Sequence, residues 1–157
     1  DSRRPRRTRL MRLMRVYLDT SALVKRYLPE RNSEAFDAYF SELAPAHISR
    51  LTLVELRSTF ARKRRQARLN PEQEAAAMNE VRTDIQNGLL TVAPSTDADF
   101  IEALRLIDDL AALPLRTLDA LHLATASVLG SGVIATADDV MRRAALQLQL
   151  EVAYFGD

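Results

Sequence analysis

Apolar residues recur with two different periods along this chain. Short apolar runs typical of β-strands cover 15–19, 46–49, 89–93, 133–136 and 151–153. The longer segments between them place apolar residues three and four positions apart, which predicts helices over 21–28, 33–43, 52–65, 71–87, 97–111, 117–129 and 140–148. Strands that alternate with helices predict right-handed crossovers and a parallel sheet covered on both faces, so the expected fold class is α/β.

One pair of predicted helices has no strand between its members. The second of them opens at Asn70 and Pro71, which are suited to the first turn of a helix, and it closes at Asn87 and Gly88. We therefore expect an antiparallel helical hairpin that projects from the sheet unit and offers a contact surface.

Length and composition fit one compact domain. The chain has 157 residues, of which 47% are apolar. Met14 resembles a natural start, so we expect 14–157 to be a single domain and 1–13 to be a basic extension, disordered or added artificially upstream. Residues 1–13 hold six Arg and one Asp; the other 16 basic and 20 acidic residues leave the domain near −4, although the whole chain has +1. The alternative role for the extension is a basic arm for RNA.

The sequence predicts a protein of the cytoplasm. Its longest nearly uncharged apolar stretch, 120–133, is shorter than the roughly 20 residues that cross a bilayer. No continuous apolar segment follows the Arg-rich start, as a signal peptide would require. The lack of cysteine excludes disulfides and thiolate metal sites, and it fits a reducing compartment.

Four acidic residues stand out as candidate site residues. Asp19 ends the first predicted strand and Asp138 follows the fourth, and ligand sites of parallel sheets form beyond such strand ends. Glu55 lies one turn into a helix, and Asp119 lies among leucines at helical spacing. Grouped carboxylates repel one another, so we expect a hard divalent cation, Mg2+ or Mn2+, to compensate them. Such an ion activates water, which predicts phosphodiester hydrolysis.

Each acid also has a purely structural interpretation. Asp19 is suited to cap a helix, as is Asp138 or its neighbour Asp139. Glu55 can pair with a basic residue, Arg62 or Lys63, later on its own helix, and Asp119 with a nearby histidine or arginine. The combination of four acids favours a functional site more than any one of them does.

Four segments around these acids resemble the PIN-domain family, particularly the VapC-type toxins of bacterial toxin–antitoxin pairs. The segments are MRVYLDTSALVKRYLPE, LTLVELRSTFARK, LRTLDALHLATA and VIATADDVMRRAA, which follow the family's order over about 14–155. The resemblance implies a three-layer α/β/α PIN-like fold with a central parallel sheet of four to five strands. It also implies metal-dependent endoribonuclease activity, homodimerisation, and neutralisation by a cognate antitoxin whose peptide enters the active-site groove.

The resemblance further implies roles for individual residues. The catalytic and metal-binding acids would be Asp19, Glu55, Asp119 and Asp138. The register of the motif favours Asp138 over Asp139 as the fourth acid. Ser21 would hydrogen-bond near the first carboxylate or a metal-bound water, and Thr136 would orient the fourth acid or a water.

A basic run and two histidines remain. The run is either a solvated face near a helix C-terminus or a patch that tracks RNA phosphates, and it consists of Arg57, Arg62, Lys63, Arg64, Arg65 and Arg68. His47 and His122 form no zinc motif, so we expect both to be structural.

Two other functions stay open beside the RNA nuclease. A noncatalytic module could capture a basic partner peptide in an acidic groove. A DNA-directed nuclease could use the same acids, because carboxylates alone do not distinguish ribose from deoxyribose. The sequence has neither a Gly-rich phosphate loop nor a GxSxG elbow, which disfavours nucleotide triphosphatases and serine hydrolases.

Overall fold

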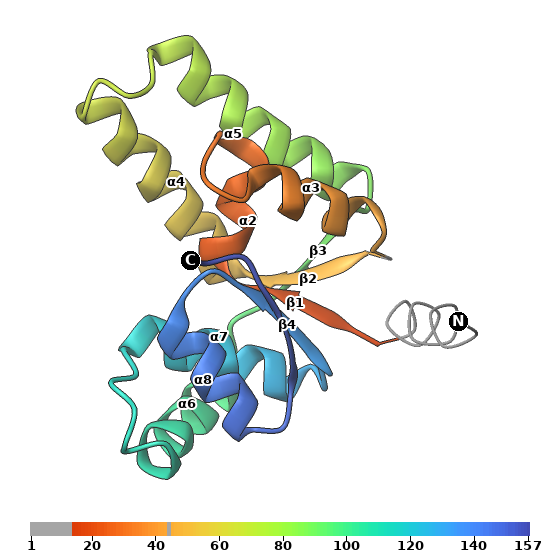
Figure 1. Cartoon of the computed structure of the whole chain (residues 1–157), viewed down its shortest axis with the longest axis vertical. Coiled ribbons are helices and arrows are strands. Elements are labelled where there is room, and N and C mark those ends of the chain that lie inside the picture. Colours follow the sequence, from red (N-terminus) through yellow and green to blue (C-terminus); the bar gives the residue numbers. More distant parts are fainter. Residues whose placement is uncertain (1–13, 44) are drawn as a thin grey trace.

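A parallel sheet forms the centre of the protein (Figure 1). The computed structural model describes residues 14–43 and 45–157. Within these residues the sheet has five strands in the order β3-β2-β1-β4-β5, and all neighbouring pairs are parallel. The strands are β1 (Val16–Leu18), β2 (Ala46–Ser49), β3 (Leu90–Ala93), β4 (Val133–Thr136) and β5 (Glu151–Tyr154). The predicted strands and the α/β fold class are confirmed.

Helices cover both faces of this sheet. The described residues contain α2 (Thr20–Tyr27), α3 (Ser33–Ser41), α4 (Arg50–Arg65), α5 (Pro71–Gln86), α6 (Asp97–Asp109), α7 (Thr117–Val128) and α8 (Asp139–Gln147). In Figure 1, α2 to α5 lie on one side of the sheet and α6 to α8 on the other, which gives three layers. Each predicted helix is present. The helix predicted over 52–65, α4, begins at Arg50 instead, because the Ser49 side chain caps it by accepting from the Thr52 N–H.

The sheet separates two apolar cores. Val16 and Leu18 on β1 pack with α2 to α5, whereas Tyr17 between them packs with α6 to α8. This alternation follows from the two-residue period of a strand. Because β1 is central and buried on both faces, the chain that leaves its C-terminal end is held in a well-defined position.

The predicted helical hairpin is also present. Helices α4 and α5 pack against each other and extend away from the sheet in Figure 1. Asn70 caps α5 by accepting from the Gln73 N–H, and Pro71 takes the first helical position. Gly88, with a φ of 75°, follows α5 and leads to β3.

Two further predictions concern the N-terminal extension and membrane-spanning helices. The expected basic extension, 1–13, lies outside the described residues. Of the helices that the structure describes, none has both the length and the apolar content that a bilayer crossing demands.

Candidate active site

Asp19 is the centre of a hydrogen-bonded cluster at the C-terminal end of β1. Its Oδ2 accepts from Ser21 Oγ at 2.7 Å and from Thr136 Oγ1 at 2.8 Å. Its backbone N–H bonds to the Ala135 carbonyl on β4, which fixes the two strand ends together. Asp19 occupies the N-cap position of α2, but its side chain makes no capping bond. The capping interpretation of this carboxylate is therefore wrong.

Asp138 joins the same cluster from the end of β4. Its backbone N–H donates to Thr136 Oγ1 at 3.0 Å, and Thr136 in turn donates to Asp19. Its Oδ1 accepts from the Met141 N–H at 2.8 Å, so Asp138 does cap α8 as one interpretation predicted. Asp139 points elsewhere, because its side chain is 54% exposed and pairs with Arg142. The geometry thus favours Asp138 over Asp139 as the acid beside Asp19.

Asp119 comes to this cluster from the first turn of α7. Its Oδ2 accepts from the Arg116 backbone N–H at 3.3 Å. Burial raises the pKa of Asp119 above its ordinary value, and the charges of Asp138 and Asp19 raise this pKa further. Three acids that lie far apart in the sequence therefore repel one another across one site.

Glu55 lies beside these acids on α4, but it is already paired. Its Oε1 accepts from Thr20 Oγ1 at 2.7 Å and from His122 Nε2. Burial alone would raise the pKa of Glu55, yet the hydrogen bonds from His122 and Thr20 hold it below the ordinary value. Within the described residues neither Arg62 nor Lys63 pairs with Glu55, and Lys63 lies 4.0 Å from Glu30 instead. The predicted pairing on its own helix is thus wrong.

His122 is the residue of this site whose position the sequence did not reveal. It is 1% exposed, and it lies between Tyr17, Glu55 and Asp19. Burial would lower the pKa of His122, but the bond to Glu55 and the charges of Asp19 and Glu55 raise it overall. The available signal was its place three residues after Asp119, which puts both side chains on the same face of α7.

The donor chemistry of the site fits a hard divalent cation. Asp19, Asp119 and Asp138 each keep one carboxylate oxygen that accepts no hydrogen bond from the described residues. In that part of the chain, however, no group of three or more His, Asp or Glu side chains is arranged to hold a metal ion directly. Mg2+ keeps several of its waters in protein sites, so carboxylates that are too far apart for direct coordination by all of them still suit it.

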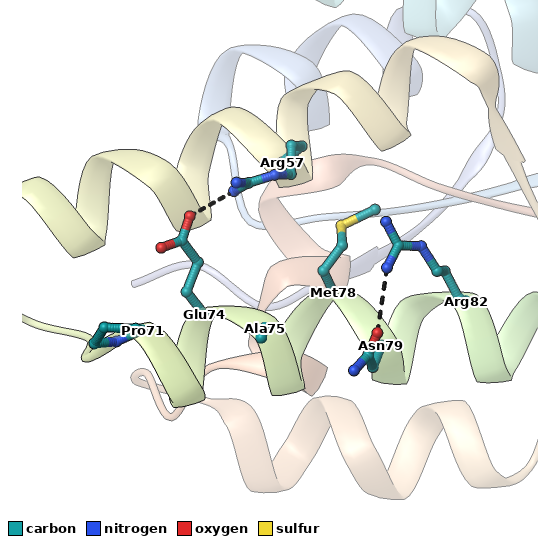
Figure 2. A pocket seen from close by; sticks show the side chains of 7 residues that line it. All are labelled: Arg57, Pro71, Glu74, Ala75, Met78, Asn79 and Arg82. Atoms are coloured by element: carbon teal, nitrogen blue, oxygen red, sulfur yellow. Dashed lines mark hydrogen bonds and ion pairs between the residues drawn. The ribbon is translucent and has the colours of Figure 1, made fainter.

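The basic run of α4 is partly engaged in ion pairs. Glu74 on α5 accepts from Arg57 at 2.7 Å and from Arg64 at 3.0 Å. Figure 2 shows the pocket between α4 and α5 that Arg57 and Glu74 line, where Arg82 also donates to Asn79. These contacts favour the structural interpretation for part of the run. The members that form no ion pair with a described residue are Arg62, Arg65 and Arg68.

Similarity to known proteins identifies the family. The PIN domain model matches residues 16–146, which include all four candidate acids. The chain belongs to the PIN-domain family. Ribonuclease VapC46 from Mycobacterium tuberculosis is 34% identical over 139 residues, which cover 87% of this chain and 95% of that protein. The predicted resemblance to VapC-type members of the family is confirmed.

Several solved structures share the fold. VapC20 from Mycobacterium tuberculosis, described as a toxin that cleaves the sarcin-ricin loop, has a TM-score of 0.66 at 16% identity and covers 82% of this chain and 94% of its own. FitAcB from Neisseria gonorrhoeae has a TM-score of 0.65 at 20% identity, with 87% and 95% covered. DNA-bound VapBC from Salmonella typhimurium has a TM-score of 0.63 at 20% identity, with 90% and 98% covered. The three-layer PIN-like fold is confirmed.

Proposed function

We propose that this protein is an endoribonuclease of a toxin–antitoxin pair, which hydrolyses RNA phosphodiester bonds with a water activated by a divalent metal ion. The observation that carries the proposal is the meeting of Asp19 and Asp138 at the ends of β1 and β4, with Glu55 beside them and with Asp119 of α7 near enough for their charges to raise its pKa. The similarity to Ribonuclease VapC46 over 95% of that protein supports RNA as the substrate.

The proposed roles follow from the chemistry of the donors. Mg2+ or Mn2+ would be held by Asp19, Glu55, Asp119 and Asp138, partly through water. When bound, the ion supplies an activated water and stabilises charge on the phosphodiester oxygens. Ser21 and Thr136 both donate to Oδ2 of Asp19, which fixes the carboxylate and leaves Oδ1 for the ion or its waters. Repulsion among the acids favours binding of a cation there.

Two protein partners belong to the proposal. One is a cognate antitoxin, and structural neighbours that include VapBC and FitAB complexes support it. The other is a second copy of this chain, because α6 exposes Phe100, Ile101 and Leu104 to solvent at 54%, 68% and 68%, and adjacent exposed apolar side chains mark interaction surfaces. We place the protein in the cytoplasm, because the proposed RNA substrate is found there and a chain without cysteine fits a reducing compartment.

A cleavage assay tests the proposed function. The purified protein is incubated with structured RNAs and, in parallel, with single-stranded DNA, in the presence of Mg2+, Mn2+ or EDTA. Discrete RNA products that EDTA abolishes are expected. Asp119→Asn should lose this activity, whereas Asp37→Asn, at an exposed position on α3, should keep it. Cleavage of DNA alone would support a DNA nuclease, and inactivity at high protein concentration would support a noncatalytic binding module.

A further inference from the structure

We infer that His122 is a positioning residue for Glu55, and that Tyr17 holds the imidazole in place. This inference rests on the proposed function, because it concerns how one of the four acids is prepared for the metal ion. It assigns a role in the reaction to a buried histidine and a buried tyrosine, neither of which is a proposed ligand of the metal ion.

A continuous chain of hydrogen bonds crosses the interior from β1 to α4. The Tyr17 hydroxyl lies 2.6 Å from His122 Nδ1, and His122 Nε2 bonds to Glu55 Oε1. Tyr17 and His122 are 0% and 1% exposed, so water does not compete for either ring nitrogen. The three residues come from three different elements, β1, α7 and α4. The chain therefore couples the position of Glu55 to the packing of the core.

The direction of these hydrogen bonds follows from the groups involved. A carboxylate only accepts, so His122 Nε2 carries the hydrogen that it donates to Glu55. The Tyr17 hydroxyl can pair with Nδ1 in either protonation state of the ring, because it donates to a neutral imidazole and accepts from a protonated one. In both states Nε2 keeps the hydrogen that Glu55 accepts, so the bond to Tyr17 fixes the ring without disturbing the bond to Glu55.

The contact determines which oxygen of Glu55 is available. Thr20 Oγ1 and His122 Nε2 both bind Oε1, whereas Oε2 accepts no hydrogen bond from the described residues. Fixing a glutamate side chain costs rotamer entropy. Because two donors already hold Oε1 in the folded protein, this entropy is lost on folding and not when the metal ion binds. His122 Nε2 also lies 3.9 Å from Asp19 Oδ1, so the imidazole lies between two of the acids. His122 thus orients Glu55 relative to Asp19 without contacting the substrate.

The test compares four single variants of the full chain. His122→Leu removes both ring nitrogens, His122→Gln keeps an N–H donor, and Tyr17→Phe removes only the hydroxyl. Tyr27→Phe is the matched control, because it removes a buried tyrosine hydroxyl that bonds to Asp84, outside the site. Each variant is measured for Mn2+ affinity without RNA, for kcat and KM on RNA, and for thermal unfolding.

Loss of a residue that orients a metal ligand typically costs 10- to 100-fold in metal affinity or activity. We expect a fall of about this size in Mn2+ affinity and kcat for His122→Leu, with KM changed little. His122→Gln should recover part of both, and Tyr17→Phe should show a smaller loss in both. Tyr27→Phe should retain the affinity and kcat of the wild type even where its unfolding temperature falls.

Several outcomes would overturn the inference. One is a folded His122→Leu with the Mn2+ affinity and kcat of the wild type. If His122→Leu does not fold, a wild-type Mn2+ affinity and kcat in Tyr17→Phe would overturn it, and so would equal losses in Tyr17→Phe and Tyr27→Phe. A wild-type protein that binds Mn2+ but cleaves no RNA would contradict the proposed function, while the Mn2+ affinities would still decide the role of His122. A wild-type protein that binds no Mn2+ would contradict both.

Discussion

Thr136 Oγ1 donates a hydrogen bond to Asp19 Oδ2 at 2.8 Å, although the two residues are 117 positions apart. They meet because β1 and β4 are parallel neighbours, with Leu18 opposite Ala135, so both strands end at the same edge of the sheet. Thr136 also accepts from the Asp138 N–H. One hydroxyl therefore sets the position of one acid and of the backbone of another, which makes it a sensitive point of the site.

Thr136→Val should impair activity without disturbing the shape of the site. Valine has nearly the volume of threonine, but it leaves Asp19 with one fewer donor and the Asp138 N–H without an acceptor. We expect kcat to fall by about 10- to 100-fold, as for other groups that orient metal ligands. The unfolding free energy should fall by about 1–3 kcal/mol for the unsatisfied buried groups. Thr136→Ser, which keeps the hydroxyl, is the control, and equal activity in both variants would contradict the role given to it.

Asp84 should make stability depend on pH. It is 3% exposed, and it accepts two hydrogen bonds from Arg26 and one from Tyr27. Burial alone would raise the pKa of Asp84, but the bonds from Arg26 and Tyr27 hold it below its ordinary value. A carboxyl whose pKa is lower in the folded state contributes stability above its unfolded pKa, about 4, and loses it as the pH falls through the folded pKa.

Urea unfolding of Asp84→Asn measures this contribution. At pH 7 the variant should be less stable than the wild type by about 3 kcal/mol, because it leaves the Arg26 charge with a weakened partner. The difference should shrink as the pH falls below about 4 and the wild-type carboxyl takes up its proton. Asp108→Asn, at an exposed position, should show neither effect. A difference that stays constant from pH 7 to pH 3 would refute this account.

The ion pairs of Glu74 divide the basic run into two groups with different expected effects on RNA binding. Arg57 and Arg64 are held by Glu74, whereas Arg62 and Arg65 are exposed and pair with no described residue. If the free members bind phosphates, Arg62→Ala with Arg65→Ala should weaken RNA binding uniformly across sequences. The slope of log affinity against log salt should then fall by about one for each phosphate that the protein no longer neutralises.

The variant with Arg57→Ala and Arg64→Ala is the matched control for charge, since it removes the same number of cations. We expect it to lower RNA affinity less, because the Glu74 carboxylate already offsets these two charges. Affinity is measured with a catalytically inactive Asp119→Asn background so that the RNA stays intact. Equal reductions of affinity in both double variants would show that the ion pairs do not limit phosphate binding.

The exposed apolar face of α6 should carry self-association. Leu104→Glu puts a charge on a side chain that is 68% exposed among Phe100 and Ile101. A homodimer that buries this face should dissociate in the variant, because an unpaired charge is costly to bury. Sedimentation velocity over a range of concentrations measures the change. Leu146→Glu on α8, exposed at 51%, is the control, and a dimer that persists in Leu104→Glu would place the interface elsewhere.

Local pattern was sufficient to predict the elements and part of the site. Each predicted strand and helix is present, because apolar period and capping residues such as Asn70 act over a few neighbouring positions. The sequence also placed Asp19 and Asp138 at strand ends, where a parallel sheet brings them to one edge. It did not predict the partner of Glu55, because that partner lies 67 positions away on another helix.

The order of apolar and polar residues was enough to establish the α/β class, the order of the elements and the acids that lie at the ends of β1 and β4. The strand order, the position of Asp138 rather than Asp139 beside Asp19, and the burial of His122 between Tyr17 and Glu55 came from the packing of distant elements. The two sets differ in the sequence distance over which the interactions act. Helix and strand preferences come from neighbours a few residues apart, whereas the partner of a buried polar group depends on how distant elements pack and on which donors that packing brings within hydrogen-bonding distance.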